Sequence, residues 1–209
     1  YGCKRPTFHD EYLPSFNLPH VHLVDTAPRG VGKINERGVV YDGVEYPVDV
    51  LIYATGFQWM ATSTFNMITG PGGRTLKDKW ASEGTKTLLG MHSSGFPNLL
   101  IMTGPQGGGG QFNFTRVCEM HANYVTWVLT TMRERGARTV DVNAEHENEY
   151  AAHCRQMDLE SQPLRDCVSY YNGDGNAEPG SLAYYGGGAR WHERREAAQA
   201  SLEPYVFQD

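Results

Sequence analysis

Residues Val48–Phe57 read Val-Asp-Val-Leu-Ile-Tyr-Ala-Thr-Gly-Phe, and the predicted architecture is built around this run. An acidic residue precedes a series of apolar and aromatic positions, and the small residues Ala54-Thr55-Gly56 follow them. A near-continuous apolar run that ends in a turn signal is typical of a strand buried on both faces of a parallel or mixed sheet. The small residues allow another backbone or a flat ligand to come close. We therefore predict a central strand over Val48–Tyr53.

The segment before this strand is rich in turns. Three β-like pieces alternate along it: Val31–Asn35, Val39–Tyr41 and Val44–Tyr46. Turn signals at Glu36–Gly38 and Asp42-Gly43 separate them, and this spacing predicts a small antiparallel meander that leads into the central strand. A further short strand is predicted over His20–Val24.

The segment after the central strand contains the strongest helical pattern. Leu99–Met102 is predicted to be a second apolar strand. Thr115–Arg135 then places apolar residues at helical spacing. Asn113 or Thr115 is suited to cap this helix, and Gly136 is suited to end it in a left-handed conformation.

Weaker patterns cover the rest of the chain. Three further helices are predicted at Leu76–Trp80, Ala144–Leu159 and Glu193–Leu202. The middle one places Tyr150, Cys154 and Met157 on one side. Ser169–Gly188 is rich in glycine and tyrosine without periodicity, and its composition predicts a loop.

Length and composition narrow the class of protein. A chain of 209 residues with 40% hydrophobic residues suits one large domain or parts of two. A net charge of −6 disfavours nucleic acid as a partner, because phosphate binding needs basic surface. No apolar run approaches the ~20 residues that a bilayer crossing needs, so no membrane partner is expected. The four cysteines lack CxxC spacing, which favours free thiols in a reducing cytoplasm over a metal site.

Four glycines at Gly107–Gly110 lie between the predicted second strand and the predicted long helix. A glycine loop that opens a helix offers free backbone N–H groups and a positive dipole end to an anion. The loop is neither a Walker motif nor a complete GxGxxG. Two interpretations stay open: a flexible connection, or a helix terminus that faces an anionic group such as the N1–C2=O edge of a reduced flavin.

Two other groups of residues have a functional and a structural interpretation. Lys4-Arg5 either recognises an anion, through the compact ammonium of lysine and the planar guanidinium of arginine, or forms a solvated turn. Tyr170-Tyr171 either stacks on a ribose or nicotinamide, or anchors a loop to the core. The eight histidines are scattered, without HExxH or Ser-His-Asp spacing, so no metal or triad site is predicted.

Taken together, these motifs resemble those of the single-chain Baeyer–Villiger monooxygenases, which use FAD and NADPH. The motifs that carry the resemblance are Gly2–Pro6, Val21–Asp25, Asp49 with Ala54–Phe57, Phe96–Asn98, Gly104-Pro105, Asn113, Pro179-Gly180 and Tyr185–Gly187. The resemblance implies an α/β fold with portions of two dinucleotide-binding, Rossmann-like domains of a flavoprotein monooxygenase and a helical and loop C-terminal cap. Residues 1–57 would be the C-terminal part of the NADP-binding domain, ending in the Ala-Thr-Gly linker. Residues 58–142 would be the C-terminal part of the FAD-binding domain, and residues 143–209 the cap.

The resemblance also implies roles for individual residues. Arg5 matches the catalytic arginine, which holds the nicotinamide end of NADP and stabilises the negatively charged, oxygenated flavin that attacks the ketone. Lys4 matches the lysine that meets the 2′-phosphate of NADP. The remaining matches are Asn113 and Phe114 beside the isoalloxazine of FAD, Gly109, Gly110 and Gln111 at the ketone pocket, and Tyr170, an aromatic on a loop that covers NADP.

The implied reaction inserts one oxygen atom from O2 beside the carbonyl of a small-molecule ketone, giving an ester or lactone. The family's glycine-rich nucleotide loops and its FxGxxxHxxxWP fingerprint are absent from this sequence, so we expect the chain to need the N-terminal part of the same enzyme and to be inactive alone. Four glycines stand where relatives carry bulkier side chains, which favours a larger ketone. Two alternatives stay open: an N-hydroxylating flavin monooxygenase, and a truncated, non-catalytic binding module.

Overall fold

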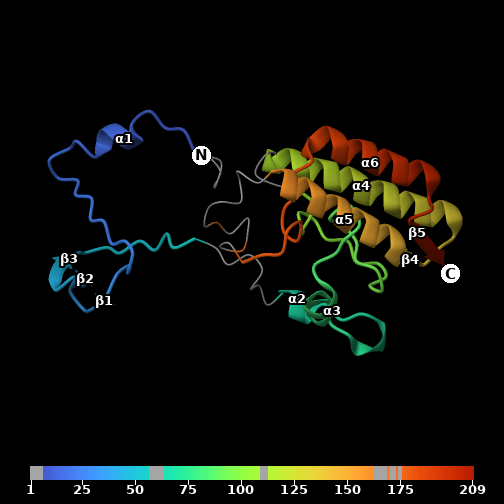
Figure 1. Cartoon of the computed structure of the whole chain (residues 1–209), viewed down its shortest axis with the longest axis horizontal. Helices are drawn as coiled ribbons and strands as arrows, with labels where there is room; N and C mark the ends of the chain where they lie inside the picture. The colour runs from blue at the N-terminus through green and yellow to red at the C-terminus, as the bar shows by residue number, and fades with distance from the viewer. Residues whose placement is uncertain (1–6, 57–63, 109–112, 162–168, 170–172, 174–175) are drawn as a thin grey trace. The chain divides into compact units, whose positions relative to one another are not determined.

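The computed structural model describes residues 7–56, 64–108, 113–161, 169, 173 and 176–209. Contacts divide it into two compact units, Pro6–Phe57 and a larger unit built on Gln58–Asp209. The elements, labelled in Figure 1, are α1 (Tyr12–Ser15), β1 (Lys33–Ile34), β2 (Gly38–Tyr41), β3 (Val44–Pro47), α2 (Thr64–Met67), η2 (Pro71–Gly73), α3 (Leu76–Glu83), α4 (Phe114–Arg135), β4 (Thr139–Val142), α5 (Ala144–Glu160), α6 (Gly187–Ser201) and β5 (Tyr205–Gln208).

The smaller unit contains the predicted antiparallel meander, in the order β1-β2-β3. The first turn forms because the Asn35 side chain accepts hydrogen bonds from the N–H groups of Arg37 and Gly38, both at 2.9 Å. The second turn has left-handed φ angles of 50° at Asp42 and 82° at Gly43, as a two-residue hairpin loop requires. The sequence prediction of these three strands is confirmed.

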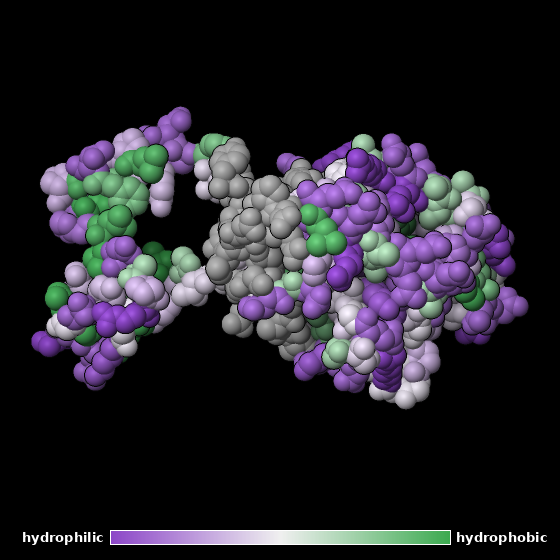
Figure 2. All heavy atoms as spheres, in the orientation of Figure 1, coloured by the Kyte–Doolittle hydropathy of each residue, from purple (hydrophilic) through white to green (hydrophobic). Residues whose placement is uncertain are grey.

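The predicted central strand over Val48–Tyr53 is wrong for this structure, which assigns no strand there. Val50 is 74% exposed and Ile52 is 82% exposed. A strand exists only where a neighbouring strand accepts and donates its backbone hydrogen bonds, and no strand of the described residues pairs with this run. The predicted strand over His20–Val24 is absent for the same reason. Figure 2 shows apolar residues at the surface of this unit.

The larger unit is organised by three helices, α4, α5 and α6, which contribute to one hydrophobic core. Its fully buried residues include Tyr124 and Val128 from α4, Cys154 from α5 and Trp191 from α6. The two-stranded sheet of β4 and β5, which the sequence did not predict, adds Val140 to the same core. The apolar residues at helical spacing therefore form the packed faces of these helices. The pairing of β4 with β5 depends instead on residues that are far apart in the sequence.

The two longest helices, α4 and α5, each begin at an asparagine side-chain cap. Asn113 caps α4, and Gly136 ends it with a left-handed φ of 67°. The α5 helix runs to Glu160, one residue beyond the predicted end, with Asn143 as its cap. The other two helices are longer than predicted, because α3 extends to Glu83 and α6 begins at Gly187.

A second, smaller core lies around α3. It consists of Leu76, Trp80 and Phe96, with partly buried Phe65 and Leu99 against it. The predicted strand Leu99–Met102 is wrong, since the structure assigns no strand there. Left-handed φ angles at Asn98 (61°) and Thr103 (56°) turn the backbone at both ends of this run and keep it from extending as a regular strand.

Among the described residues, no helix combines the length and apolar character that crossing a membrane would require.

Candidate functional site

The candidate site is the start of α4 together with the loop of residues 103–108 that leads toward it, here called the 103–108 loop. His121, on the buried face of α4, holds this loop at both ends. Its Nδ1 accepts a hydrogen bond from the Thr103 N–H at 3.0 Å, and its Nε2 lies 3.1 Å from the Gly107 carbonyl oxygen. A carbonyl only accepts, so Nε2 carries the proton. Burial lowers the pKa of His121, which keeps this ring neutral.

Two glycine backbones touch beneath the loop. A Cβ at Gly90 would lie 2.0 Å from the Gly107 Cα, and the φ of Gly90 is +73°. A Cβ at Gly107 would lie 3.0 Å from the His121 ring. Glycine is therefore required at position 90. The glycine at position 107 lets the loop come close to the backbone at Gly90 and to His121 of α4.

Gln106 is the central side chain of the loop and is 1% exposed. Its Oε1 accepts hydrogen bonds from the Thr87 N–H (2.9 Å) and hydroxyl (2.8 Å). Its Nε2 donates to the carbonyls of Thr85 (3.2 Å) and Gly180 (2.7 Å). Its backbone carbonyl accepts from the Tyr150 hydroxyl at 2.9 Å. The loop is thus fixed to three separate parts of the larger unit.

The N-terminus of α4 is suited to an anionic, flat group. The Asn113 Oδ1 accepts hydrogen bonds from the N–H groups of Thr115 (3.0 Å) and Arg116 (3.3 Å), which sets the direction of the first turn. Phe114, the first helical residue, is 56% exposed. The positive end of a 22-residue helix beside an exposed aromatic ring fits the anionic edge and the flat ring of a flavin.

Of the predicted site residues, the structure places Asn113 and Phe114 next to each other at this helix start. The others lie outside the described residues and stay predictions: Lys4, Arg5, Gly109, Gly110, Gln111 and Tyr170. Sequence reasoning assigned no role to His121 or Gln106. His121 could have been found, because its spacing from Val117 and Tyr124 places it on the buried face of the long helix.

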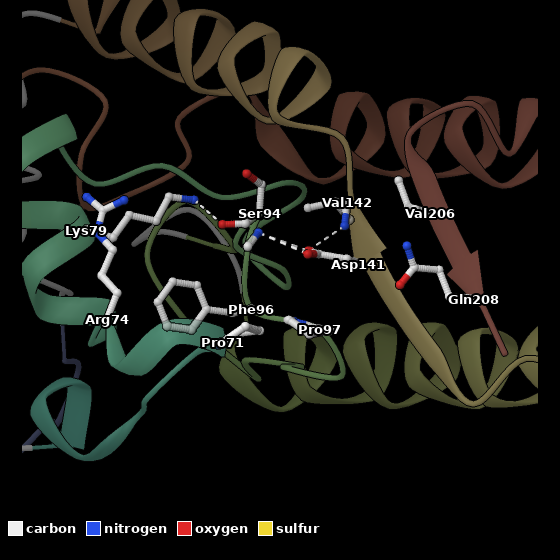
Figure 3. A pocket seen from close by; sticks show the side chains of 11 residues that line it. Pro71, Arg74, Lys79, Ser94, Phe96, Pro97, Asp141, Val142, Val206 and Gln208 are labelled. Carbon is white, nitrogen blue, oxygen red and sulfur yellow. Dashed lines mark hydrogen bonds between the residues drawn. The ribbon is translucent and has the colours of Figure 1, made fainter.

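A cavity of about 480 Å³ lies elsewhere in the larger unit (Figure 3). Its charged lining groups already have partners. The Asp141 carboxylate accepts hydrogen bonds from the N–H groups of Gly95 (3.0 Å) and Val142 (2.7 Å). Arg74 pairs with an acidic side chain of α3 at 2.7 Å, and Lys79 forms a buried ion pair. This cavity therefore resembles a structural junction more than a site for a charged ligand.

One other group of buried polar side chains forms a closed network. The Lys79 ammonium lies 2.8 Å from the Glu147 carboxylate, and Ser93 and Ser94 complete their hydrogen bonds. Within the described residues, no group of three or more histidine, cysteine or acidic side chains is arranged to hold a metal ion.

The cysteines in the described part of the chain, Cys118 and Cys154, are free. Burial raises the pKa of Cys154 to about 12, so its thiol is not a nucleophile.

Comparison with known proteins identifies the family. No family model matches the chain. It is 37% identical over 216 residues to a Baeyer–Villiger monooxygenase of Streptomyces coelicolor, covering 98% of this chain and 36% of that protein. It is 38% identical over 194 residues to the Baeyer–Villiger monooxygenase peniC of Penicillium patulum, covering 88% of this chain and 31% of that protein. The chain thus spans about a third of these relatives.

Solved structures of monooxygenases also match this chain. An oxidised steroid monooxygenase bound to NADP matches 100% of this chain and 39% of its own with a TM-score of 0.86 and 28% identity. A polycyclic ketone monooxygenase of Thermothelomyces thermophila matches 99% of this chain and 35% of its own with a TM-score of 0.83 and 30% identity. These matches confirm the α/β fold class and the resemblance predicted from the motifs. The chain therefore belongs to the family of the Baeyer–Villiger monooxygenases.

Proposed function

We propose that the protein containing this chain is an FAD- and NADPH-dependent Baeyer–Villiger monooxygenase of the cytoplasm. The observation that carries the proposal is the match of almost the whole chain, in sequence and in fold, to enzymes with this name. In the reaction, a ketone, O2, NADPH and a proton give an ester or lactone, NADP⁺ and water. One oxygen atom enters the bond beside the carbonyl, and the other leaves as water.

The cofactor assignment is supported by the relatives and by the helix start. The steroid monooxygenase is bound to NADP, and another structural match, OTEMO, is described as a complex with FAD and NADP. FAD, when bound, supplies the chemistry with O2. We assign Asn113 and Phe114 to the flavin ring, because the positive end of α4 stabilises negative charge there.

The remaining residue roles are those that the family resemblance implies for this sequence. A guanidinium does not deprotonate, so Arg5 is the residue suited to hold negative charge at the reacting centre. Lys4 meets the 2′-phosphate and Tyr170 covers NADP. The pocket for the ketone is lined by Gly109, Gly110 and Gln111. Residues 1–57, 58–142 and 143–209 are assigned to the NADP-binding domain, the FAD-binding domain and the cap.

The decisive experiment uses the complete protein. It is incubated with NADPH, isotopically labelled O2 and a panel of cyclic and polycyclic ketones, and parallel reactions contain amines. One labelled oxygen in an ester or lactone, with NADPH consumption, is the expected result. N-hydroxylated amines with unchanged ketones would identify the alternative N-hydroxylating class, which the named relatives do not favour.

The 209-residue chain by itself is a second test. It lacks the glycine-rich motifs that bind the pyrophosphates of FAD and NADP, so we expect the purified chain to show no stoichiometric flavin absorbance and no NADPH oxidation. Stoichiometric bound flavin would contradict this expectation. A binding module that acts without catalysis would be indicated if the complete natural protein also bound no flavin.

A further inference from the structure

Gln106 lies where three parts of the larger unit meet, and its polar atoms are all engaged. Its side chain makes four hydrogen bonds, to Thr85, Thr87 and Gly180, at 2.7–3.2 Å. The side chain is 1% exposed, so water cannot replace a lost partner. Its φ of 63° is left-handed, which is uncommon outside glycine, asparagine and aspartate. The surroundings therefore hold this residue in one conformation.

The 103–108 loop runs alongside the segment of residues 180–184, here called the tail segment. The Gln106 N–H donates to the Leu182 carbonyl at 2.8 Å, and the Tyr184 N–H donates to the Gly108 carbonyl at 3.1 Å. The tail segment is itself anchored, since the Gly180 N–H donates to the Asp158 carboxylate at 2.6 Å. A Cβ at Gly180 would lie 2.3 Å from the backbone nitrogen of Arg155, so this anchor depends on glycine.

The chain connects this junction to two predicted binding regions. Gly109, Gly110 and Gln111, assigned to the ketone pocket, directly follow the 103–108 loop in sequence. Tyr170, assigned to NADP, precedes the tail segment in sequence. The carboxamide of Gln106, a side chain of the 103–108 loop, bonds Thr87 through its oxygen and Gly180 of the tail segment through its nitrogen. It cannot rotate toward one of these partners without breaking its hydrogen bonds to the other.

We propose that Gln106 is a positioning residue that couples the 103–108 loop, which precedes the predicted ketone pocket in the sequence, to the tail segment, which follows the predicted NADP-covering residue Tyr170. This inference rests on the proposed function. Gln106 touches neither the substrate nor a cofactor in this proposal. It sets the position of the 103–108 loop relative to the tail segment, and the two predicted binding regions are attached to these segments along the chain. Loss of its side-chain hydrogen bonds therefore weakens binding of the ketone and of NADPH together.

The test compares two variants of the complete protein. Gln106→Met keeps the length of the side chain and removes its hydrogen bonds. Gln156→Met is the matched control, because Gln156 is an exposed residue of α5 whose Nε2 donates to the carboxylate of Glu160 within its own helix, at 2.9 Å. Initial rates are measured with NADPH and ketone varied separately. The fraction of oxidised NADPH that yields ester is measured in the same reactions.

For Gln106→Met we expect the KM for NADPH and the KM for the ketone each to rise about tenfold, with a smaller fraction of NADPH yielding ester. Gln156→Met is expected to match the wild type. A merely structural role would lower the melting temperature and the amount of active enzyme, and would leave both KM values unchanged. Unchanged KM values, or a rise in only one of them, would overturn the proposal.

A gentler variant keeps the proposal testable if Gln106→Met does not fold. Tyr150→Phe removes one hydroxyl, which donates to the Gln106 carbonyl at 2.9 Å, and is expected to raise both KM values about twofold. If both stay at the wild-type value, the proposal fails. Failure of the proposed function is a separate result, because then the wild-type protein itself forms no ester from any ketone.

Discussion

Two valine-rich runs of this chain have opposite environments. In β4, Val140 and Val142 are 1% and 4% exposed, whereas in the Val48–Tyr53 run Val50 and Ile52 are 74% and 82% exposed. Both runs have the residue types that favour strands. The difference is that β4 pairs with β5 in antiparallel register, Val140 opposite Phe207, while the other run pairs with no described strand. An apolar run therefore indicates a need for burial, and its partners decide whether burial occurs.

The two units of the chain show the same contrast in the burial of their hydrophobic side chains. All the buried hydrophobic side chains among the described residues lie between Leu76 and Tyr205, in the larger unit. The smaller unit has a well-formed meander, but its described residues, 7–56, form no hydrophobic core of their own. Hydrogen-bonded turns can thus shape a sheet locally, but stability requires a buried apolar face.

The largest expected effect concerns the buried ion pair of the larger unit. Lys79→Met leaves the Glu147 carboxylate buried without its cation, which should lower the free energy of unfolding of the larger unit by roughly 3–5 kcal/mol. Lys79 and Glu147 side chains are 4% and 2% exposed. Lys77→Met, at an exposed position of the same helix, is the control and should change stability by no more than about 0.5 kcal/mol. Denaturant unfolding measures both, and equal effects would contradict the assigned role of the pair.

A pair of valine substitutions tests the comparison directly. Val140→Ala should lower the free energy of unfolding by about 2 kcal/mol, because it removes buried methyl groups and leaves a cavity. Val50→Ala should change it by less than about 0.5 kcal/mol in the 209-residue chain, since Val50 is 74% exposed. Repeating Val50→Ala in the complete protein sharpens the comparison. A loss there similar to that of Val140→Ala would show that the rest of the protein covers this run.

The smallest expected effect, counted per pH unit, is a pH dependence that comes from the larger unit. The Nε2 atom of His92 is hydrogen-bonded to the Tyr124 hydroxyl at 2.9 Å, and the Tyr124 hydroxyl is hydrogen-bonded to the Tyr205 hydroxyl at 2.8 Å. Burial lowers the pKa of His92 from 6.5 to about 3. The native state therefore binds fewer protons than the unfolded state between these values. The stabilising effect is complete above pH 6.5 and is lost as the pH falls, at roughly 1.4 kcal/mol per pH unit.

His92→Gln should make the free energy of unfolding less dependent on pH between about 6 and 4, because the titrating group is removed. His20→Gln, at an exposed histidine of the smaller unit, should leave the slope unchanged. Chemical unfolding at several pH values measures the slopes. The interpretation would be wrong if His92→Gln kept the wild-type slope.

Prediction from the sequence succeeded where the determining interactions are local. The meander follows from its turn residues, the α4 helix from its periodicity, and its ends from Asn113 and Gly136. At the candidate site the same local rules indicated Asn113 as the helix cap, whereas Phe114 was assigned only through the family resemblance. They did not identify Gln106, because its function as a junction depends on Thr87 and Gly180, which lie far from it in sequence.

The sequence by itself determined the long helices α4 and α5, the hairpin turns and the family, since periodicity, capping and ordered motifs are properties of neighbouring residues. The tertiary structure alone decided which apolar runs became strands and that β4 pairs with β5. It also decided how His121 and Gln106 hold the 103–108 loop. Pairing and burial depend on groups brought together from distant parts of the chain. The same valines and isoleucines can therefore be core residues in one place and surface residues in another.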